Sequence, residues 1–101
     1  MAVKDTVENA INSNTITIFS KTYCPYCKRA KSLLTSTFPN VQTKIIELDE
    51  LDEGSAIQDY LFEKTNQRSV PNIFINQKHV GGCDRVVELN SKGQLAPLVN
   101  A

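Results

Sequence analysis

The sequence predicts an α/β fold in which one four-stranded mixed sheet carries helices on both faces. Short β-branched runs alternate with segments of helical periodicity in the first part of the chain, and two short strands close together follow them. A strand, a helix and another strand in succession favour a parallel pair joined by a right-handed crossover, whereas the later two strands form an antiparallel hairpin. A chain of 101 residues suffices for a single domain, 1–101, that buries about two-thirds of its unfolded surface.

The first part of the chain alternates helix, strand and helix. Apolar residues recur at helical spacing over 3–11, and the polar cluster 12–14 ends that pattern. Residues 15–20 are rich in β-branched side chains and form a run short enough for a buried strand. A second helix is expected over 25–38, because a proline suits its first turn and an apolar stripe runs along it. Pro39 ends this helix.

The middle of the chain predicts a second strand, a third helix and the hairpin. Residues 44–48 form an apolar run suited to a strand, and the acidic stretch 49–55 is expected to be a turn. The apolar spacing within 57–61 indicates a helix. Only two residues separate the strand runs 72–75 and 78–81, which favours a tight hairpin.

The last part of the chain begins with a loop at Gly82. Asp84 is expected to cap a helix whose apolar residues lie within 86–89. Gly93 interrupts that helix, and a short tail around 95–98 follows.

Composition and charge describe an ordinary globular protein. Eleven basic and eleven acidic residues give a formal net charge of zero, which provides no basic excess for nucleic acid or an anionic membrane. Three cysteines are too few for a secreted disulfide framework, and an odd count leaves at least one thiol free. The N-terminus lacks a signal-peptide pattern, and no run approaches the roughly 18 apolar residues of a membrane span. The expected compartment is the cytoplasm.

The stretch Cys24-Pro25-Tyr26-Cys27 carries the chemistry. Two thiols separated by two residues, between a predicted strand and a predicted helix, indicate a thiol–disulfide redox site. Cys24 occupies the N-cap position, where its sulfur accepts hydrogen bonds from backbone N–H groups of Tyr26 and Cys27 and where Lys21 adds a positive charge. These effects favour the attacking thiolate, so its pKa is expected well below the free-thiol value of about 8.5. Cys27 is expected to be more buried and to act as the resolving thiol.

Plainer interpretations remain beside this one. Free cysteines often pack as small apolar residues, an alternative that two thiols at this spacing make weak for Cys24 and Cys27 but that is the simpler one for Cys83. His79 has no neighbouring ligands at metal-binding spacing, and no metal is expected. A basic cluster and an acidic run are interpreted as solvated surfaces, with a lesser possibility that the basic one docks acidic partners. The basic cluster comprises Lys28, Arg29 and Lys31. The acidic run comprises Glu47, Asp49, Glu50, Asp52 and Glu53.

Over essentially its whole length the chain resembles a dithiol glutaredoxin of the thioredoxin fold. The segments that carry the resemblance are 21–27, which ends in Cys-Pro-Tyr-Cys, 58–61, the Ser-Val-Pro at 69–71 and the Gly-Gly-Cys-Asp at 81–84. The tetrapeptide is highly specific. The resemblance implies a glutathione-dependent thiol–disulfide oxidoreductase that reduces protein–glutathione mixed disulfides and some protein disulfides.

The resemblance also implies where glutathione, the co-substrate, binds. It places the Ser69–Val70 peptide against the backbone of the glutathione cysteine, with Pro71 in the cis form. Lys21 and Gln58 match positions that bind the glycine carboxylate. The loop at the start of the last helix holds the γ-glutamyl end. The full implied set is Lys21, Tyr26, Gln58, Ser69, Val70, Pro71, Gly82, Cys83 and Asp84.

The sequence departs from the family pattern at two positions. Ser69 replaces the usual threonine before Val-Pro and keeps the hydroxyl. Arg85 stands where many relatives carry an acidic residue that receives the α-amino group of glutathione, so the way this amine is held is open.

Two rival functions are considered. A thioredoxin would be reduced by a protein rather than by glutathione, but the absence of tryptophan and the presence of Tyr26 argue against it. An iron–sulfur scaffold would hold a cluster between two chains through Cys24 and two glutathiones. Pro25 and the competing thiol of Cys27 argue against this alternative. The expected partners are glutathione and glutathionylated or disulfide-bonded proteins, with the chain as a monomer.

Overall fold

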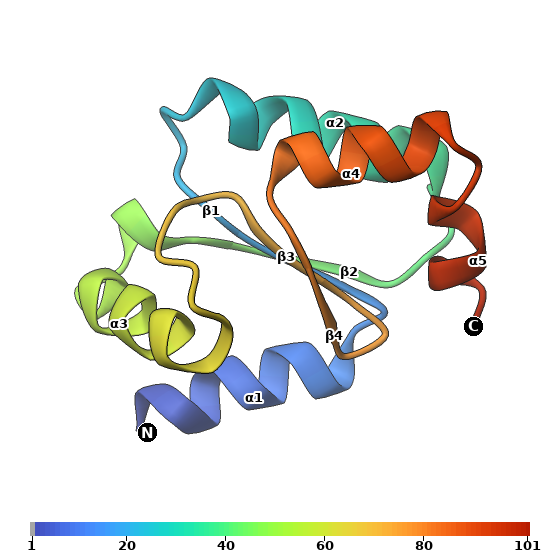
Figure 1. Ribbon diagram of the computed structural model, residues 1–101. Helices are drawn as coiled ribbons and strands as arrows, with labels where there is room; N and C mark the ends of the chain where they lie inside the picture. The colour runs from blue at the N-terminus through green and yellow to red at the C-terminus, as the bar shows by residue number, and fades with distance from the viewer. Residues whose placement is uncertain (1) are drawn as a thin grey trace.

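The structure, a computed structural model, describes residues 2–101. Its elements are α1 (Val3–Ser13), β1 (Ile16–Ser20), α2 (Pro25–Thr37), β2 (Thr43–Glu47), the 3-10 helix η1 (Leu48–Glu50), α3 (Gly54–Thr65), β3 (Asn72–Ile75), β4 (Lys78–Gly81), α4 (Cys83–Ser91) and α5 (Leu95–Val99). A central sheet lies between a layer of α2, α4 and α5 and a layer of α1 and α3 (Figure 1). This is the predicted thioredoxin-type α/β fold.

The sheet has four strands in the order β2-β1-β3-β4. β1 pairs in parallel with β2 and antiparallel with β3, so that Ile18 lies opposite Ile45 on one side and Ile73 on the other. β3 and β4 form the predicted hairpin. Its turn residues Asn76 and Gln77 have φ angles of 48° and 71°, and two positive φ values at adjacent positions characterise a turn whose twist matches that of the strands.

Alternating side chains of the buried strands divide the core between the two faces of the sheet. Ile16 and Ile18 of β1 face the layer of α2, α4 and α5. Phe19 faces α1 and α3, where its ring meets the ring of Phe74 edge-on at a centroid distance of 6.0 Å. Both faces of β1 are therefore buried, and the strand ends at the segment that carries the cysteines.

The acidic turn is shorter than predicted. Leu48 begins the 3-10 helix η1, and α3 already starts at Gly54. A Cβ atom at Gly54 would lie only 2.0 Å from the carbonyl oxygen of Leu48, so the close packing of η1 on α3 requires glycine there.

The prediction that Asp84 caps α4 is wrong. The N-cap is Gly82, and Asp84 is the second residue of the helix, where an acidic side chain still suits the positive end of the helix dipole. The tail also differs from expectation, because 95–99 form the short helix α5. The amide of Asn76 donates to the carbonyl oxygens of Leu98 and Val99 at 2.7 and 3.0 Å, and this contact with the hairpin turn holds α5 in place.

The longest helix of the described residues, α2, has 13 residues. Within 2–101, none of the helices combines the length and the apolar character needed to cross a membrane.

Candidate active site

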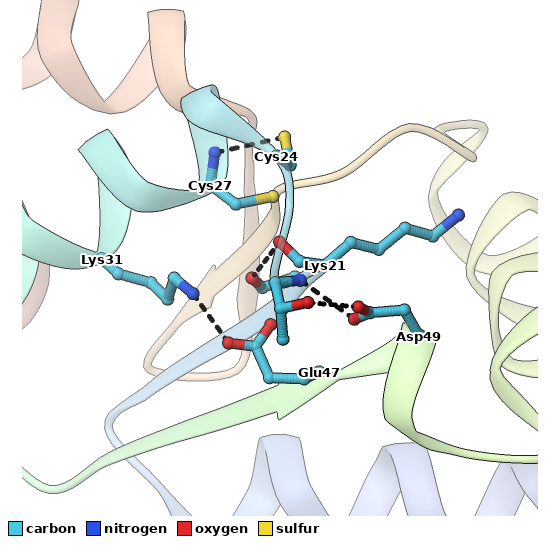
Figure 2. A network of polar contacts seen from close by, with 8 residues as sticks. Lys21, Cys24, Cys27, Lys31, Glu47 and Asp49 are labelled. Carbon is cyan, nitrogen blue, oxygen red and sulfur yellow. Dashed lines mark hydrogen bonds and ion pairs between the residues drawn. The ribbon is translucent and has the colours of Figure 1, made fainter.

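Cys24 occupies the N-cap of α2, as the sequence predicts. Its backbone is extended, with φ −86° and ψ 118°, and Pro25 takes the first helical position. The backbone N–H of Cys27 donates to the Cys24 Sγ at 3.3 Å (Figure 2). The side chain of Cys24 is partly exposed, so its sulfur is both held by the helix terminus and accessible from outside.

The surroundings of Cys24 favour the thiolate. Burial opposes the charged form, but the Cys27 thiol and the backbone N–H groups of Cys27 and Tyr26 donate to the sulfur, and the net result is a lowered pKa of Cys24. A positive charge adds to this effect. It comes from Lys31, whereas the Lys21 side chain extends away from the Cys24 sulfur in Figure 2.

Cys27 is the opposite kind of thiol. It has no exposed surface, and burial together with its hydrogen bond to Cys24 raises the pKa of Cys27 to about 11. The structure holds Cys24, Cys27 and Cys83 as free thiols. Adjacent thiols of such different acidity suit a pair in which Cys24 attacks and Cys27 resolves.

The loop before β3 lies against Cys24. The Val70–Pro71 peptide bond is cis, as the resemblance implies, and the carbonyl oxygen of Val70 lies 3.9 Å from the Cys24 Sγ. Residues far apart in the chain thus meet at the reactive sulfur.

A cleft of about 430 Å³ adjoins this contact. Most of the implied glutathione-binding residues line it, and Gln67 and Arg85 line it as well. The full lining is Tyr26, Gln67, Ser69, Val70, Pro71, Gly82, Cys83, Asp84 and Arg85. The start of α4 and the loop before β3 are therefore brought together, as expected.

Gln67 is a cleft residue that the sequence analysis did not identify as part of the site. Its side-chain amide donates to the carbonyl oxygens of Ser69 and Pro71, both at 3.0 Å, and so fixes the shape of the loop. The amide of the buried Asn72 in turn donates to the Gln67 carbonyl at 3.2 Å. An amide residue shortly before the Val-Pro pair is the only sequence signal for this role.

Lys21 and Gln58 lie outside the residues that line the cleft. The Gln58 amide donates to the carbonyl oxygen of Arg68 at 3.0 Å, next to Ser69, so Gln58 braces the loop at the edge of the cleft. The guanidinium of Arg68 pairs with Asp59 on α3.

The start of α4 closes the other side of the cleft. Cys83 is 4% exposed and packs in the apolar core, as the simpler interpretation of this cysteine expects, and burial raises the pKa of its thiol. The exposed guanidinium of Arg85 pairs with Glu88 one turn along the helix.

The interpretation of the acidic run and the basic cluster as solvated surfaces is wrong for Lys31 and Glu47, whose side chains are only 19% and 20% exposed, whereas Asp49 is exposed as expected. Lys31 forms an ion pair with Glu47, with a distance of 2.7 Å between Nζ and Oε2. Asp49 accepts hydrogen bonds from the backbone N–H and the hydroxyl of Thr22. The spacing of charged residues along the chain does not reveal these contacts, because each one joins the segment 47–49 to another part of the fold.

The comparisons with known proteins agree with this geometry. The glutaredoxin family model matches residues 16–80. Glutaredoxin-1 of Rhizophagus irregularis is 52% identical over 99 residues, which cover 98% of this chain and 96% of that protein.

Solved structures of glutaredoxins superpose closely on this one. The holo form of glutaredoxin C1 from Populus tremula × tremuloides has a TM-score of 0.90 and 42% identity, covering 99% of this chain and 97% of that one. A buckwheat glutaredoxin, solved in complex with glutathione, has a TM-score of 0.89 and 43% identity, covering 97% of this chain and 87% of that one. The family match, the relatives and the cysteine pair at the start of α2 agree, and the chain belongs to the glutaredoxin family, the glutathione-dependent thiol–disulfide oxidoreductases.

Proposed function

We propose that the protein reduces protein–glutathione mixed disulfides with Cys24 as the nucleophile. The Cys24 thiolate attacks the glutathione sulfur, the disulfide bond to the protein breaks, and the protein thiolate leaves and takes up a proton. Cys24 is then joined to glutathione. The thiolate of a second glutathione attacks the glutathione sulfur of this intermediate, which forms oxidised glutathione and restores the Cys24 thiolate.

Cys27 provides a second route. After losing its proton, the Cys27 sulfur attacks Cys24, releases glutathione and forms a Cys24–Cys27 disulfide, which two glutathiones then reduce. Protein disulfides are reduced through the same disulfide. Burial disfavours the Cys27 thiolate, so the glutathione route carries most of the turnover.

One observation carries the proposal. The Cys24 sulfur sits at the N-terminus of α2 and lies 3.9 Å from the Val70 carbonyl oxygen, which belongs to the wall of the cleft. A tripeptide in this cleft therefore has its sulfur beside the nucleophile.

The cleft offers backbone groups for glutathione. The Ser69–Val70 peptide lines one wall and pairs with the extended tripeptide as a strand does. The first backbone N–H groups of α4, at Cys83 and Asp84, precede the first helical hydrogen bond and bind the γ-glutamyl carboxylate. The complex of the buckwheat relative with glutathione supports this assignment.

The remaining implied residues lie at the rim. Tyr26 lines the cleft and is 56% exposed. Lys21 and Gln58 hold the glycine carboxylate at the end of the cleft near Ser69. The braced carbonyl of Arg68 beside Gln58 is consistent with this role.

The partners are glutathionylated or disulfide-bonded proteins, and the single domain works as a monomer. The reaction consumes reduced glutathione, so the protein works in a compartment that keeps glutathione reduced, which we take to be the cytoplasm.

The iron–sulfur scaffold is not favoured. Both cysteines lie at the start of α2, where the backbone N–H of Cys27 donates to the Cys24 sulfur, and a disulfide between these two residues competes with any ligand that needs Cys24.

The test is turnover of a small glutathione mixed disulfide with glutathione, glutathione reductase and NADPH, run beside reduction of a protein disulfide with thioredoxin reductase. We expect efficient turnover only with glutathione. Activity that depends on thioredoxin reductase alone would overturn the proposal.

A further inference from the structure

Two acidic side chains, at and just after the end of β2, contact the part of the chain that surrounds Cys24 and Cys27. Glu47 is the last residue of the strand and Asp49 lies in the following 3-10 helix, with Leu48 between them 2% exposed in the core. Glu47 pairs with α2, and Asp49 accepts from the loop between β1 and α2 (Figure 2). One short segment therefore contacts the chain on both sides of the cysteines.

The contact of Glu47 is well shielded. Its Oε2 lies 2.7 Å from the Lys31 ammonium, and the two side chains are only 20% and 19% exposed. Lys31 follows Cys27 by one helical turn, on the same face of α2. The other carboxylate oxygen, Oε1, is buried and has no hydrogen-bond partner among the described residues. A buried carboxylate oxygen without a partner is costly, so the pair with Lys31 is an unusual feature that needs an explanation.

The contact of Asp49 holds the loop. It accepts from the Thr22 backbone N–H at 2.9 Å and from the Thr22 hydroxyl. The backbone N–H of Cys24 donates to the Lys21 carbonyl at 3.1 Å, which makes a tight turn around Thr22. Fixing Thr22 therefore fixes the backbone that presents Cys24.

We propose that Glu47 and Asp49 are positioning residues for Cys24, Glu47 by holding the Lys31 ammonium one turn after Cys27 on α2 and Asp49 by fixing the turn at Thr22. Neither carboxylate touches the reacting sulfurs. The inference rests on the proposed role of Cys24 as the nucleophile. It explains why two members of an acidic run contact the site, whereas Glu50, exposed like its neighbour Asp49, has no side-chain hydrogen bond or ion pair among the described residues and serves as a control.

The Glu47 contact is tested by two substitutions that remove the same charge. Glu47→Gln keeps an oxygen that accepts from Lys31, whereas Glu47→Ala releases the ammonium. We expect the Cys24 pKa, read from the pH dependence of iodoacetamide alkylation, to be about half a unit higher in Glu47→Ala than in Glu47→Gln. In a Lys31→Met background the difference should vanish. Equal Cys24 pKa values for the Gln and Ala variants of the otherwise unchanged protein would overturn the role of Glu47.

The Asp49 contact is tested by turnover and alkylation together. We expect Asp49→Ala to lower kcat/KM for a glutathionylated peptide about tenfold, because the sulfur is misplaced relative to the cleft. The rate at which iodoacetamide alkylates Cys24, measured at a pH where the thiol is fully ionised, should change less than twofold, because this small reagent does not need the cleft. Asp49→Asn retains an acceptor for the Thr22 N–H and should recover most of the activity, and Glu50→Ala should match the unchanged protein.

The outcomes distinguish a failure of the proposed nucleophile from a failure of the positioning role. Activity that survives in Cys24→Ser would overturn the proposed nucleophile itself. If Cys24→Ser is inactive but Asp49→Ala turns over normally, or loses turnover and alkylation equally, the positioning role of Asp49 is wrong.

Discussion

The Cys24 sulfur lies 3.9 Å from the carbonyl oxygen of Val70, although the two residues are 46 positions apart in the chain. The contact joins the N-terminus of α2 to the loop before β3, and the cleft begins there. The Cys24 sulfur is thus bounded by a helix N–H group on one side and by the carbonyl edge of the loop before β3 on the other.

The two cysteines should differ in importance. We expect Cys24→Ser to reduce turnover of a glutathione mixed disulfide to background, because it removes the low-pKa nucleophile. Cys27→Ser should stay within about threefold of the unchanged protein, since a second glutathione resolves the intermediate. Steady-state kinetics of both variants with glutathione and glutathione reductase measure this. Equal losses would show that the Cys24–Cys27 disulfide is obligatory.

Cys24 should be alkylated at pH values where an ordinary thiol is still protonated and unreactive. The lowered pKa of Cys24 keeps the sulfur ionised as the pH falls below the free-thiol value of about 8.5, and reactivity is lost only as the pH falls through the lower folded-state value. Cys27, with a pKa of about 11, should contribute little at neutral pH. Mass-resolved iodoacetamide labelling across pH measures the midpoint, with Cys24→Ser as the control. A midpoint at or above 8.5 would contradict the argument.

Arg85 should weaken glutathione recognition slightly. Arg85 lines the cleft, but its guanidinium pairs with Glu88, and its side chain is 54% exposed. Since exposed charge pairs contribute about 0–1 kcal/mol, Arg85→Asp should lower KM for the glutathionylated substrate by no more than about fivefold, with kcat little changed. Arg85→Gln, which removes the charge alone, should give a smaller decrease. A rise in KM would show that Arg85 makes a favourable contact with glutathione.

Tyr60 should contribute to stability through Glu8. Its hydroxyl donates to Glu8 Oε2 at 2.6 Å across the α1–α3 contact, and Lys64 lies 2.9 Å from the same oxygen. Hydrogen bonds from Tyr60 and Lys64 lower the pKa of Glu8. Tyr60→Phe should therefore cost about 1 kcal/mol of unfolding free energy at neutral pH, measured by urea denaturation.

The pH dependence of this contribution has a definite sign. A carboxyl whose pKa is lowered by folding stabilises the protein above its unfolded-state value of 4.5, and the stabilisation is lost as the pH falls through the lower folded-state value. The difference in stability between the unchanged protein and Tyr60→Phe should accordingly shrink in acid. A difference that stays constant down to low pH would show that Glu8 is not involved.

Gly54 should not tolerate a side chain. Alanine normally stabilises a helix relative to glycine by about 1 kcal/mol, but here the new Cβ would lie 2.0 Å from the backbone oxygen of Leu48. We expect Gly54→Ala to destabilise the protein by about 1–3 kcal/mol, because η1 must move away from α3. Glu63→Ala, at an exposed position of the same helix, should stay within about 0.5 kcal/mol. An unchanged denaturation midpoint for Gly54→Ala would mean that the two elements are not packed this closely.

The sequence by itself determined the local features of this protein. The N-cap position of Cys24, the helix after Pro25 and the tight turn at 76–77 depend on residues close together in the chain, and the structure has all of them. The period of the apolar residues likewise predicts which segments are helices and strands. The ends of some elements moved, as at Gly82, where the cap lies two residues before Asp84, and the short helices η1 and α5 were not predicted.

The tertiary structure decided which distant residues act on the sulfur. Lys31 rather than Lys21 supplies the nearby charge, Gln67 shapes the cleft, and Glu47 and Asp49 reach the site from the end of β2. No local pattern indicates such contacts, because an exposed charge has the same spacing whether it faces water or a neighbouring element. They follow from the order of the strands, which brings the end of β2 beside the end of β1 and places both beneath α2.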